Sequence, residues 1–159
     1  MNWVHIHLLL NHLPVIGILV ALPILTWGIW KRSEDVLRLA LALLATLAAV
    51  TMVVYFTGEP AEESVEGLAG VSESLIERHE EAALFATAAF AAVGVLALGG
   101  LIRFRRRAMP ARFAVLVLVL ALIPAGMVAW TANLGGQIRH TEIRPGAPTE
   151  SPVPNALGD

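Results

Sequence analysis

The residues of this sequence best suited to chemistry are its histidines: His5, His7, His12, His79 and His140. A neutral imidazole is a good ligand for haem iron, copper and zinc, and it titrates near neutral pH. Ionisable groups inside or at the edge of a membrane bundle are candidates for function because placing them there costs free energy. Whether these side chains can meet depends on the elements that carry them.

Four apolar stretches can cross a hydrocarbon core, which takes about 20 helical residues. The composition agrees: 57% of the 159 residues are hydrophobic, only 15% are charged, and the mean hydropathy is +0.70. Backbone groups in lipid must be hydrogen-bonded within the segment, so these stretches are expected to be helices. The sequence therefore predicts an all-α fold, a bundle of four transmembrane helices in one domain over residues 1–143. The helices are expected at about residues 8–30, 36–56, 74–102 and 113–136.

The charged residues predict the orientation. Eight of the eleven Lys and Arg residues flank the turns after the first and third helices: Lys31, Arg32, Arg38, Arg103, Arg105, Arg106, Arg107 and Arg112. Cytoplasmic loops of membrane proteins carry this excess of basic residues. We expect a multi-pass protein of the bacterial inner membrane with both termini on the outer, periplasmic side, so all five histidines fall on that side.

The outer side also carries the longest loop and the C-terminal tail. Residues 57–63, Thr-Gly-Glu-Pro-Ala-Glu-Glu, predict a helix stop followed by a new helical start. Ser74 and Glu77 have the spacing of a capping box, which places the start of the third helix near Ser74. The tail, residues 144–159, is rich in Pro and Gly and is expected to be a mobile external segment.

The histidines and their small neighbours predict a haem site. His12 and His79 each lie just inside a membrane helix, and they are the preferred pair of ligands. Small residues follow the helical face next to His79 and the face leading back from His140: Ala82, Ala83, Ala86, Ala125, Gly126, Ala129, Ala132, Asn133 and Gly136. A porphyrin between helices needs close ligand helices and small neighbours, which is the requirement of a b-type haem with two histidine ligands. His140, His5 and His7 are alternative or second-site ligands.

Other interpretations of the same residues remain open. Small-residue faces are also the ordinary means by which membrane helices pack, with no cofactor involved. Interfacial histidines can be simple anchors. A histidine and carboxylate set, with Glu59 and Glu80 joining His12 and His79, is a ligand set for zinc, copper or iron. Because the chain has no cysteine, thiolate metal sites and covalent c-type haem attachment are excluded.

Four segments together resemble a group of small bacterial four-helix membrane proteins of uncharacterised function. They are Asn-His-Leu-Pro at residues 11–14, Thr-Gly-Glu-Pro-Ala at 57–61, Glu-x-His-Glu at 77–80 and Ala-Asn-x-Gly-Gly at 132–136. The resemblance covers about residues 1–143. The layout of this group is similar to that of membrane b-type cytochromes, so the resemblance implies a four-helix bundle in which paired histidines hold haem.

The function expected from these observations is that of a membrane electron-transfer or quinol-linked subunit. It would bind haem b near the outer membrane face, and it is expected to be a redox or accessory subunit rather than a stand-alone enzyme. The rival interpretations are a cofactor-free accessory subunit of a larger membrane complex and a membrane protein that binds metal through His and Glu. The expected partners are the lipid bilayer and either quinone or a larger complex. No basic-aromatic surface for nucleic acid is visible in the sequence.

Overall fold

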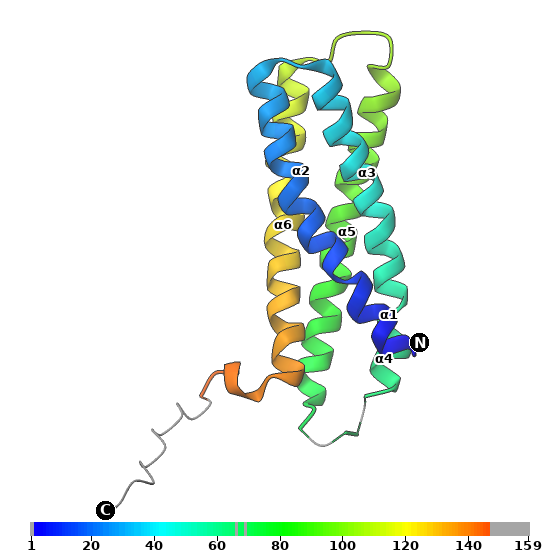
Figure 1. The fold of residues 1–159 in the computed structure, drawn as a ribbon, viewed down its shortest axis with the longest axis vertical. Coiled ribbons are helices and arrows are strands. Elements are labelled where there is room, and N and C mark those ends of the chain that lie inside the picture. Colours follow the sequence, from blue (N-terminus) through cyan, green and yellow to red (C-terminus); the bar gives the residue numbers. More distant parts are fainter. Residues whose placement is uncertain (1, 66, 69, 147–159) are drawn as a thin grey trace, which may run out of the picture.

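The structure, a computed structural model, describes residues 2–65, 67–68 and 70–146. Every regular element in this part of the chain is helical, and the order along the chain is α1 (Trp3–Leu10), α2 (His12–Lys31), α3 (Glu34–Phe56), α4 (Gly58–Glu63), α5 (Glu73–Arg103), α6 (Ala111–Arg139) and the 3-10 turn η1 (Thr141–Ile143). The predicted all-α bundle is confirmed. The N-terminal residues and the end of α6 lie at the same end of the bundle (Figure 1).

The four long helices pack as a closed ring. The α3 helix packs against α2 and α5, α5 against α6, and α6 returns to α2. Glycines bring the helices close: a β-carbon on Gly94 of α5 would overlap Ala48 of α3, and one on Gly17 of α2 would overlap Leu47. Small residues at crossing points are the usual means of packing helices in lipid, where no hydrophobic effect drives the helices together.

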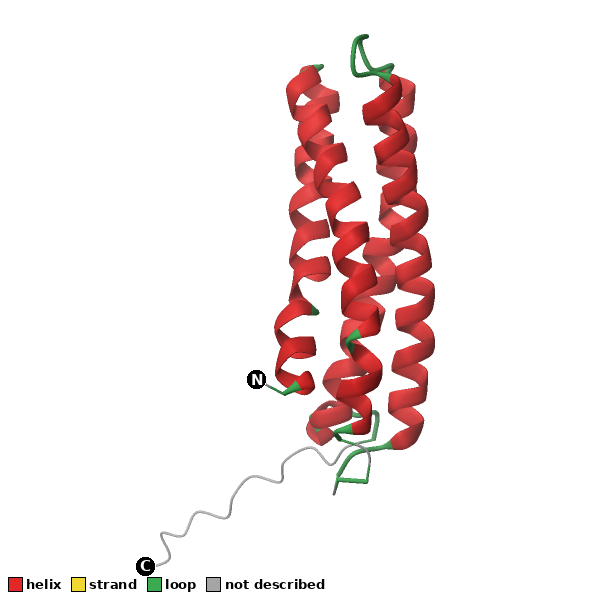
Figure 2. Cartoon of the chain, turned by 90° about the vertical axis from the view of Figure 1, so that its right-hand side faces the viewer, coloured by secondary structure: helices red, strands yellow, loops and turns green. Residues whose placement is uncertain are grey.

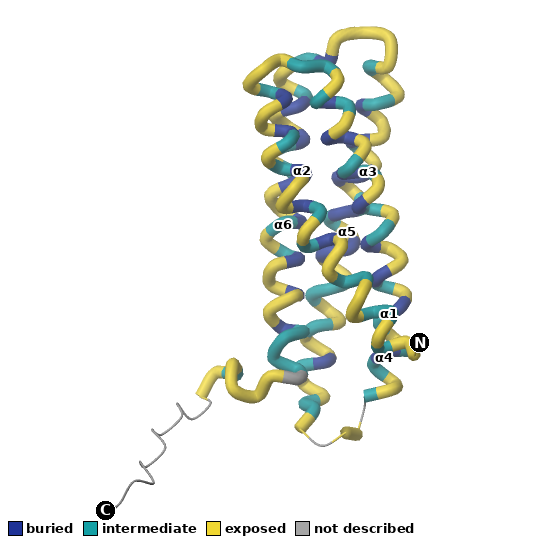
Figure 3. The backbone as a smooth tube through the Cα atoms, viewed as in Figure 1, coloured by how far each residue is buried: buried dark blue, intermediate teal, exposed yellow. Residues whose placement is uncertain are grey.

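The outer surface of the ring is apolar, as a membrane requires. Four helical stretches are long and apolar enough to cross a membrane, and they run over Trp3–Lys31, Glu34–Glu63, Glu73–Arg103 and Ala111–Ile138. Large apolar side chains on them point outward, among them Val95 (73% exposed) and Phe56 (69%). The buried residues lie on the faces turned into the bundle, and the exposed ones cover the outside (Figure 3). An apolar surface of this extent is typical of contact with lipid.

The first transmembrane segment is longer than expected and is interrupted at Asn11. It begins at Trp3, five residues before the predicted start at residue 8, and the interruption separates α1 from α2. Pro14 supplies the physical reason, because it has no N–H to donate to the carbonyl of Leu10. Asn11 keeps helical dihedral angles (φ −64°, ψ −20°), so the chain continues in nearly the same direction. The α1 helix packs on α4 at the end of the bundle (Figure 1).

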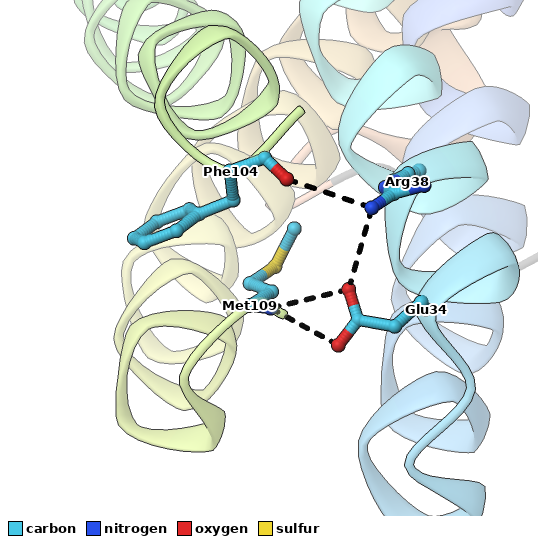
Figure 4. A network of polar contacts seen from close by, with 4 residues as sticks. All are labelled: Glu34, Arg38, Phe104 and Met109. Atoms are coloured by element: carbon cyan, nitrogen blue, oxygen red, sulfur yellow. Dashed lines mark hydrogen bonds and ion pairs between the residues drawn. The ribbon is translucent and has the colours of Figure 1, made fainter. Parts of the chain in front are cut away.

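The opposite end of the bundle is closed by one polar network (Figure 4). Both carboxylate oxygens of Glu34 accept the main-chain N–H of Met109, at 3.0 and 3.1 Å. Arg38 lies 3.8 Å from the same carboxylate, and its Nη2 is 3.5 Å from the carbonyl of Phe104. The network joins the start of α3 to the loop that connects α5 with α6. The loops are confined to the two ends of the bundle (Figure 2).

Two local predictions have different outcomes. The new helical start after Thr57 is confirmed, because α4 begins at Gly58. The capping box at Ser74 is wrong: α5 begins at Glu73, its N-cap residue is Ser72, and no side chain caps it. Ser74 lies within the first turn instead, with its hydroxyl 3.1 Å from that of Ser72. Most of the predicted mobile tail, residues 147–159, lies outside the described residues.

Candidate functional site

The histidine-bearing segments meet at the end of the bundle where the chain begins. This end contains α1 and α4, the start of α5 and the end of α6 (Figure 1). His5 and His7 lie on α1 and His12 is the first residue of α2, while His79 lies near the start of α5 and His140 follows α6. Two of the five, His7 and His79, make hydrogen bonds to other elements of the bundle.

His79 bridges α5 and α6. Its Nδ1 lies 2.9 Å from the main-chain carbonyl oxygen of Thr131, and the side chain is partly buried. A carbonyl oxygen only accepts, so Nδ1 carries the proton and donates it. Gly135 makes this approach possible, because it presents no side chain to the imidazole. The ring is therefore fixed in one tautomer, with an unprotonated Nε2 when it is neutral.

His7 is held in the same way from the other side. Its Nδ1 lies 3.1 Å from Oγ1 of Thr57, which is buried between α3 and α4. The Thr57 hydroxyl donates its own proton to the carbonyl of Val54 at 2.7 Å. The hydroxyl can then only accept from His7, so Nδ1 of His7 is also the protonated nitrogen. Gly58 also lies next to this ring. A β-carbon added to Gly58 would lie 3.6 Å from Cε1 of His7, which is an ordinary van der Waals contact.

The two held imidazoles lie at the same end of the bundle and are bound in matching ways. His7 on α1 meets Thr57 between α3 and α4, and His79 near the start of α5 meets Thr131 of α6. Each ring has its Nδ1 within hydrogen-bond distance of a protein oxygen, and the His7 ring also interacts with the main chain of Val54. Ligand histidines in metal and haem sites have this arrangement, since the other ring N–H is donated to an oxygen that fixes the tautomer and the ring orientation.

The other three histidines are exposed and contact only nearby residues of the chain. His5 meets the side chain of Asn2, which caps α1, with Nδ1 2.8 Å from Oδ1. The Nδ1 of His12 lies 2.7 Å from the carbonyl of Leu8, one turn earlier. His12 is exposed and bonds within its own segment, whereas His7 and His79 bond to other elements of the bundle.

His140 pairs with an acid just beyond α6. Its Nδ1 lies 2.7 Å from Oε1 of Glu142, and both side chains are exposed. Hydrogen bonds from the Glu142 main-chain N–H and from the His140 ring hold the pKa of the Glu142 carboxyl below its usual value. Arg144 lies at the same end of the bundle and donates hydrogen bonds to the main-chain carbonyls of Gln137, Ile138 and Gly70. The tail is thus anchored up to Arg144.

The carboxylates proposed for a metal site do not join the histidine pair. Glu59 on α4 and Glu80 on α5 are both exposed. Within the described ranges, no group of three or more His, Cys, Asp or Glu side chains is arranged to hold a metal ion. The small residue that faces the imidazole of His79 is Gly135, while the neighbouring Gly136 faces Ile143. The candidate site therefore consists of two imidazoles at one end of the bundle, with His7 held at Thr57 and His79 held against Gly135 and Thr131.

Comparison with known proteins gives no match: no family model, no curated protein and no solved structure is similar to this chain. A four-helix bundle serves many functions, so the fold does not identify one. The features that bear on function are therefore those of the site itself, the two imidazoles and the oxygens that hold them.

Proposed function

We propose that the chain is a membrane electron-transfer subunit that binds a b-type haem, with His7 and His79 as the axial ligands. The observation that carries this proposal is the matched pair of hydrogen bonds at Nδ1, to Thr57 on one side and to Thr131 on the other. Both bonds leave Nε2 as the basic nitrogen. Two neutral imidazoles from different helices are a suitable set of protein ligands for a b-type haem.

Haem fits this pair better than a bare metal ion does. A structural zinc site takes four protein ligands and a catalytic one takes three, whereas a porphyrin supplies four of the six donors to its iron. The described residues offer two imidazoles without a third ligand beside them. A site for zinc, copper or iron that includes Glu59 or Glu80 would need an exposed carboxylate to turn inward. Haem needs no ligand beyond the two histidines.

The residues around the pair would hold and orient the group. Thr57 and the Thr131 carbonyl fix the ring planes and make each imidazole more electron-rich by accepting its Nδ1 proton. Gly135 lets the His79 ring lie close against α6, and Gly58 lies against the His7 ring. Both histidines are partly buried, which limits the access of water. When bound, haem supplies one-electron chemistry, and the chain sets its potential through the ligands, hydrogen bonds and burial.

The charge distribution supports a location at the periplasmic face of the inner membrane. The end opposite the histidines carries the loop with Arg103, Arg105, Arg106 and Arg107 and the turn with Lys31 and Arg32. This basic end would face the cytoplasm, with both termini outside. An electron carrier at this position could exchange electrons with quinol in the membrane or with a larger membrane complex, and these are the partners that we propose.

An absorption spectrum of the purified full-length protein tests the proposal. We expect a Soret band that shifts on reduction with dithionite and a pyridine haemochrome typical of haem b. A colourless preparation that stays colourless after incubation with haemin would contradict the proposal. In that case a cofactor-free accessory subunit becomes the better interpretation, and elemental analysis then distinguishes it from a protein with a zinc, copper or iron site.

A further inference from the structure

A groove of about 540 Å³ runs along the outside of α5 and α6, at the histidine-bearing end of the bundle. It lies on the surface of the helix pair and is distinct from the His7–His79 pair. Its lining includes Arg78, Glu81 and Phe85 from α5 and Gly126, Trp130 and Leu134 from α6. The two helices are antiparallel, so Arg78 lies level with Leu134, and Phe85 lies about two turns deeper, toward Gly126.

The two charged residues of the groove lie at its outer end. Arg78 and Glu81 are three residues apart on α5 and therefore share one face of the helix. Both are exposed, and neither forms an ion pair or a hydrogen bond within the described part of the chain. The outer end of the groove thus presents one free positive charge and one free negative charge side by side.

The deep end of the groove is apolar and open. Phe85 is 54% exposed and Trp130 is 57% exposed, so their rings form walls that the rest of the described chain leaves open. A β-carbon on Gly126 would have no neighbour within 4 Å, which shows that space remains above this residue. In a membrane this end faces the acyl chains and the outer end faces the headgroups.

We propose that this groove binds one zwitterionic phospholipid, such as phosphatidylethanolamine. The guanidinium of Arg78 pairs with the phosphate, the carboxylate of Glu81 pairs with the ammonium, and one acyl chain lies over Gly126 between the aromatic rings. The phosphate and the ammonium of this headgroup are separated by two carbons, a spacing similar to that of side chains at positions i and i+3.

The charges of the groove favour this occupant over two others. Phosphatidylglycerol would satisfy Arg78 through its phosphate but has no ammonium to pair with Glu81. A quinone headgroup is neutral and would leave both charged side chains without a partner. The inference depends on the membrane location of the chain and not on the presence of haem, so a lipid measurement and a haem measurement can fail separately.

Lipid titration of the purified, delipidated full-length protein in detergent tests the inference. Binding is measured by native mass spectrometry with phosphatidylethanolamine, phosphatidylglycerol and a short-chain ubiquinone as the three probes. We expect the wild type to prefer phosphatidylethanolamine over phosphatidylglycerol by at least threefold in dissociation constant. Gly126→Leu should weaken phosphatidylethanolamine binding at least tenfold because leucine fills the open space.

Two further variants make the result specific. Gly99→Leu is the matched control, because Gly99 is also an exposed helical glycine with nothing within 4 Å of its β-carbon position but lies outside the groove. It should bind as the wild type does. Glu81→Gln, a change at an exposed side chain, should remove the preference over phosphatidylglycerol. Equal binding of the two lipids by the wild type, tighter binding of ubiquinone, or the same effect of both leucine variants would overturn the inference.

Discussion

Gly135 on α6 lies directly against the imidazole of His79 on α5. A β-carbon at Gly135 would lie 3.0 Å from Cε1 and 3.3 Å from Nδ1 of that ring, which is closer than side chains normally pack. The glycine therefore determines how near the ring can come to α6. At this distance the ring reaches the Thr131 carbonyl, and its Nε2 is left as the free nitrogen.

Gly135→Ala should displace the His79 ring and weaken its hydrogen bond to Thr131. The loss of a hydrogen bond that supports a ligand reduces the affinity of such sites about 10- to 100-fold. We expect haem affinity, measured by haemin titration, to fall by about tenfold. Gly136→Ala is the control, because its β-carbon would lie at an ordinary 3.5 Å from Ile143. Equal affinities of the two variants would contradict this role of Gly135.

Thr57→Val should release His7 without changing the size of the side chain. The variant leaves the Nδ1–H of His7 without its acceptor, and leaving a buried donor unpaired costs about 1–3 kcal/mol. The imidazole also becomes a less electron-rich ligand, so we expect the reduction potential of the haem to rise and its affinity to fall about tenfold.

Thr51→Val is the matched control for this experiment. Thr51 is also a buried threonine of α3, but its hydroxyl bonds only to the carbonyl of Leu47 in its own helix. The reduction potential of the haem in Thr51→Val, measured by redox titration, should equal that in the wild type. A shift of the potential in Thr51→Val as large as that in Thr57→Val would show that His7 is not responsible.

Glu34→Gln should loosen the end of the bundle opposite the histidines. The amide has one acceptor oxygen where the carboxylate has two, and it loses the attraction of Arg38. Hydrogen bonds to charged groups contribute about 1.5–3 kcal/mol, and the half-exposed ion pair adds little, so we expect a loss of about 1–2 kcal/mol in the free energy of unfolding.

Asp35→Asn provides the comparison for Glu34→Gln. Asp35 is exposed in the same first turn of α3, so its removal subtracts the same charge from the same helix end. We expect a change within about 0.5 kcal/mol, as for other exposed positions. Thermal unfolding in detergent measures both variants, and similar losses in the two would assign the effect to helix charge instead of to the bond with Met109.

The orientation can be read from single cysteines, since the chain has none of its own. Ser64→Cys places a thiol after α4 at the histidine end, and Ala108→Cys places one in the basic loop, both at exposed positions. A membrane-impermeant maleimide should label the first in intact cells and the second only after the membrane is opened. The reverse pattern would place the histidine pair in the cytoplasm.

The sequence was sufficient to predict the bundle because a membrane span is encoded locally. Each span needs only a run of apolar residues, and the helix ends follow from the charged residues on either side. The first helix was the exception. Its extension to Trp3 depends on the packing of α1 against α4, a contact between segments about 50 residues apart that no local pattern encodes.

The histidine pair was harder to predict than the helices. The sequence favours His12 because it lies just inside the first apolar stretch, but the position of α4 brings Thr57 to His7. The partner of His79 is a main-chain carbonyl, which every residue has, so the sequence contains no sign of it. The sequence does contain Gly135. It is next to Gly136, one of the small residues on the helical face that leads back from His140.

The haem content of four histidine variants is the most direct test of the central claim that His7 and His79 hold the cofactor. Haem per protein is measured by the pyridine haemochrome method in purified His7→Ala, His79→Ala, His12→Ala and His140→Ala. We predict at least a tenfold loss in the first two and wild-type content in the last two. Full haem content in His7→Ala together with its loss in His12→Ala would contradict the account.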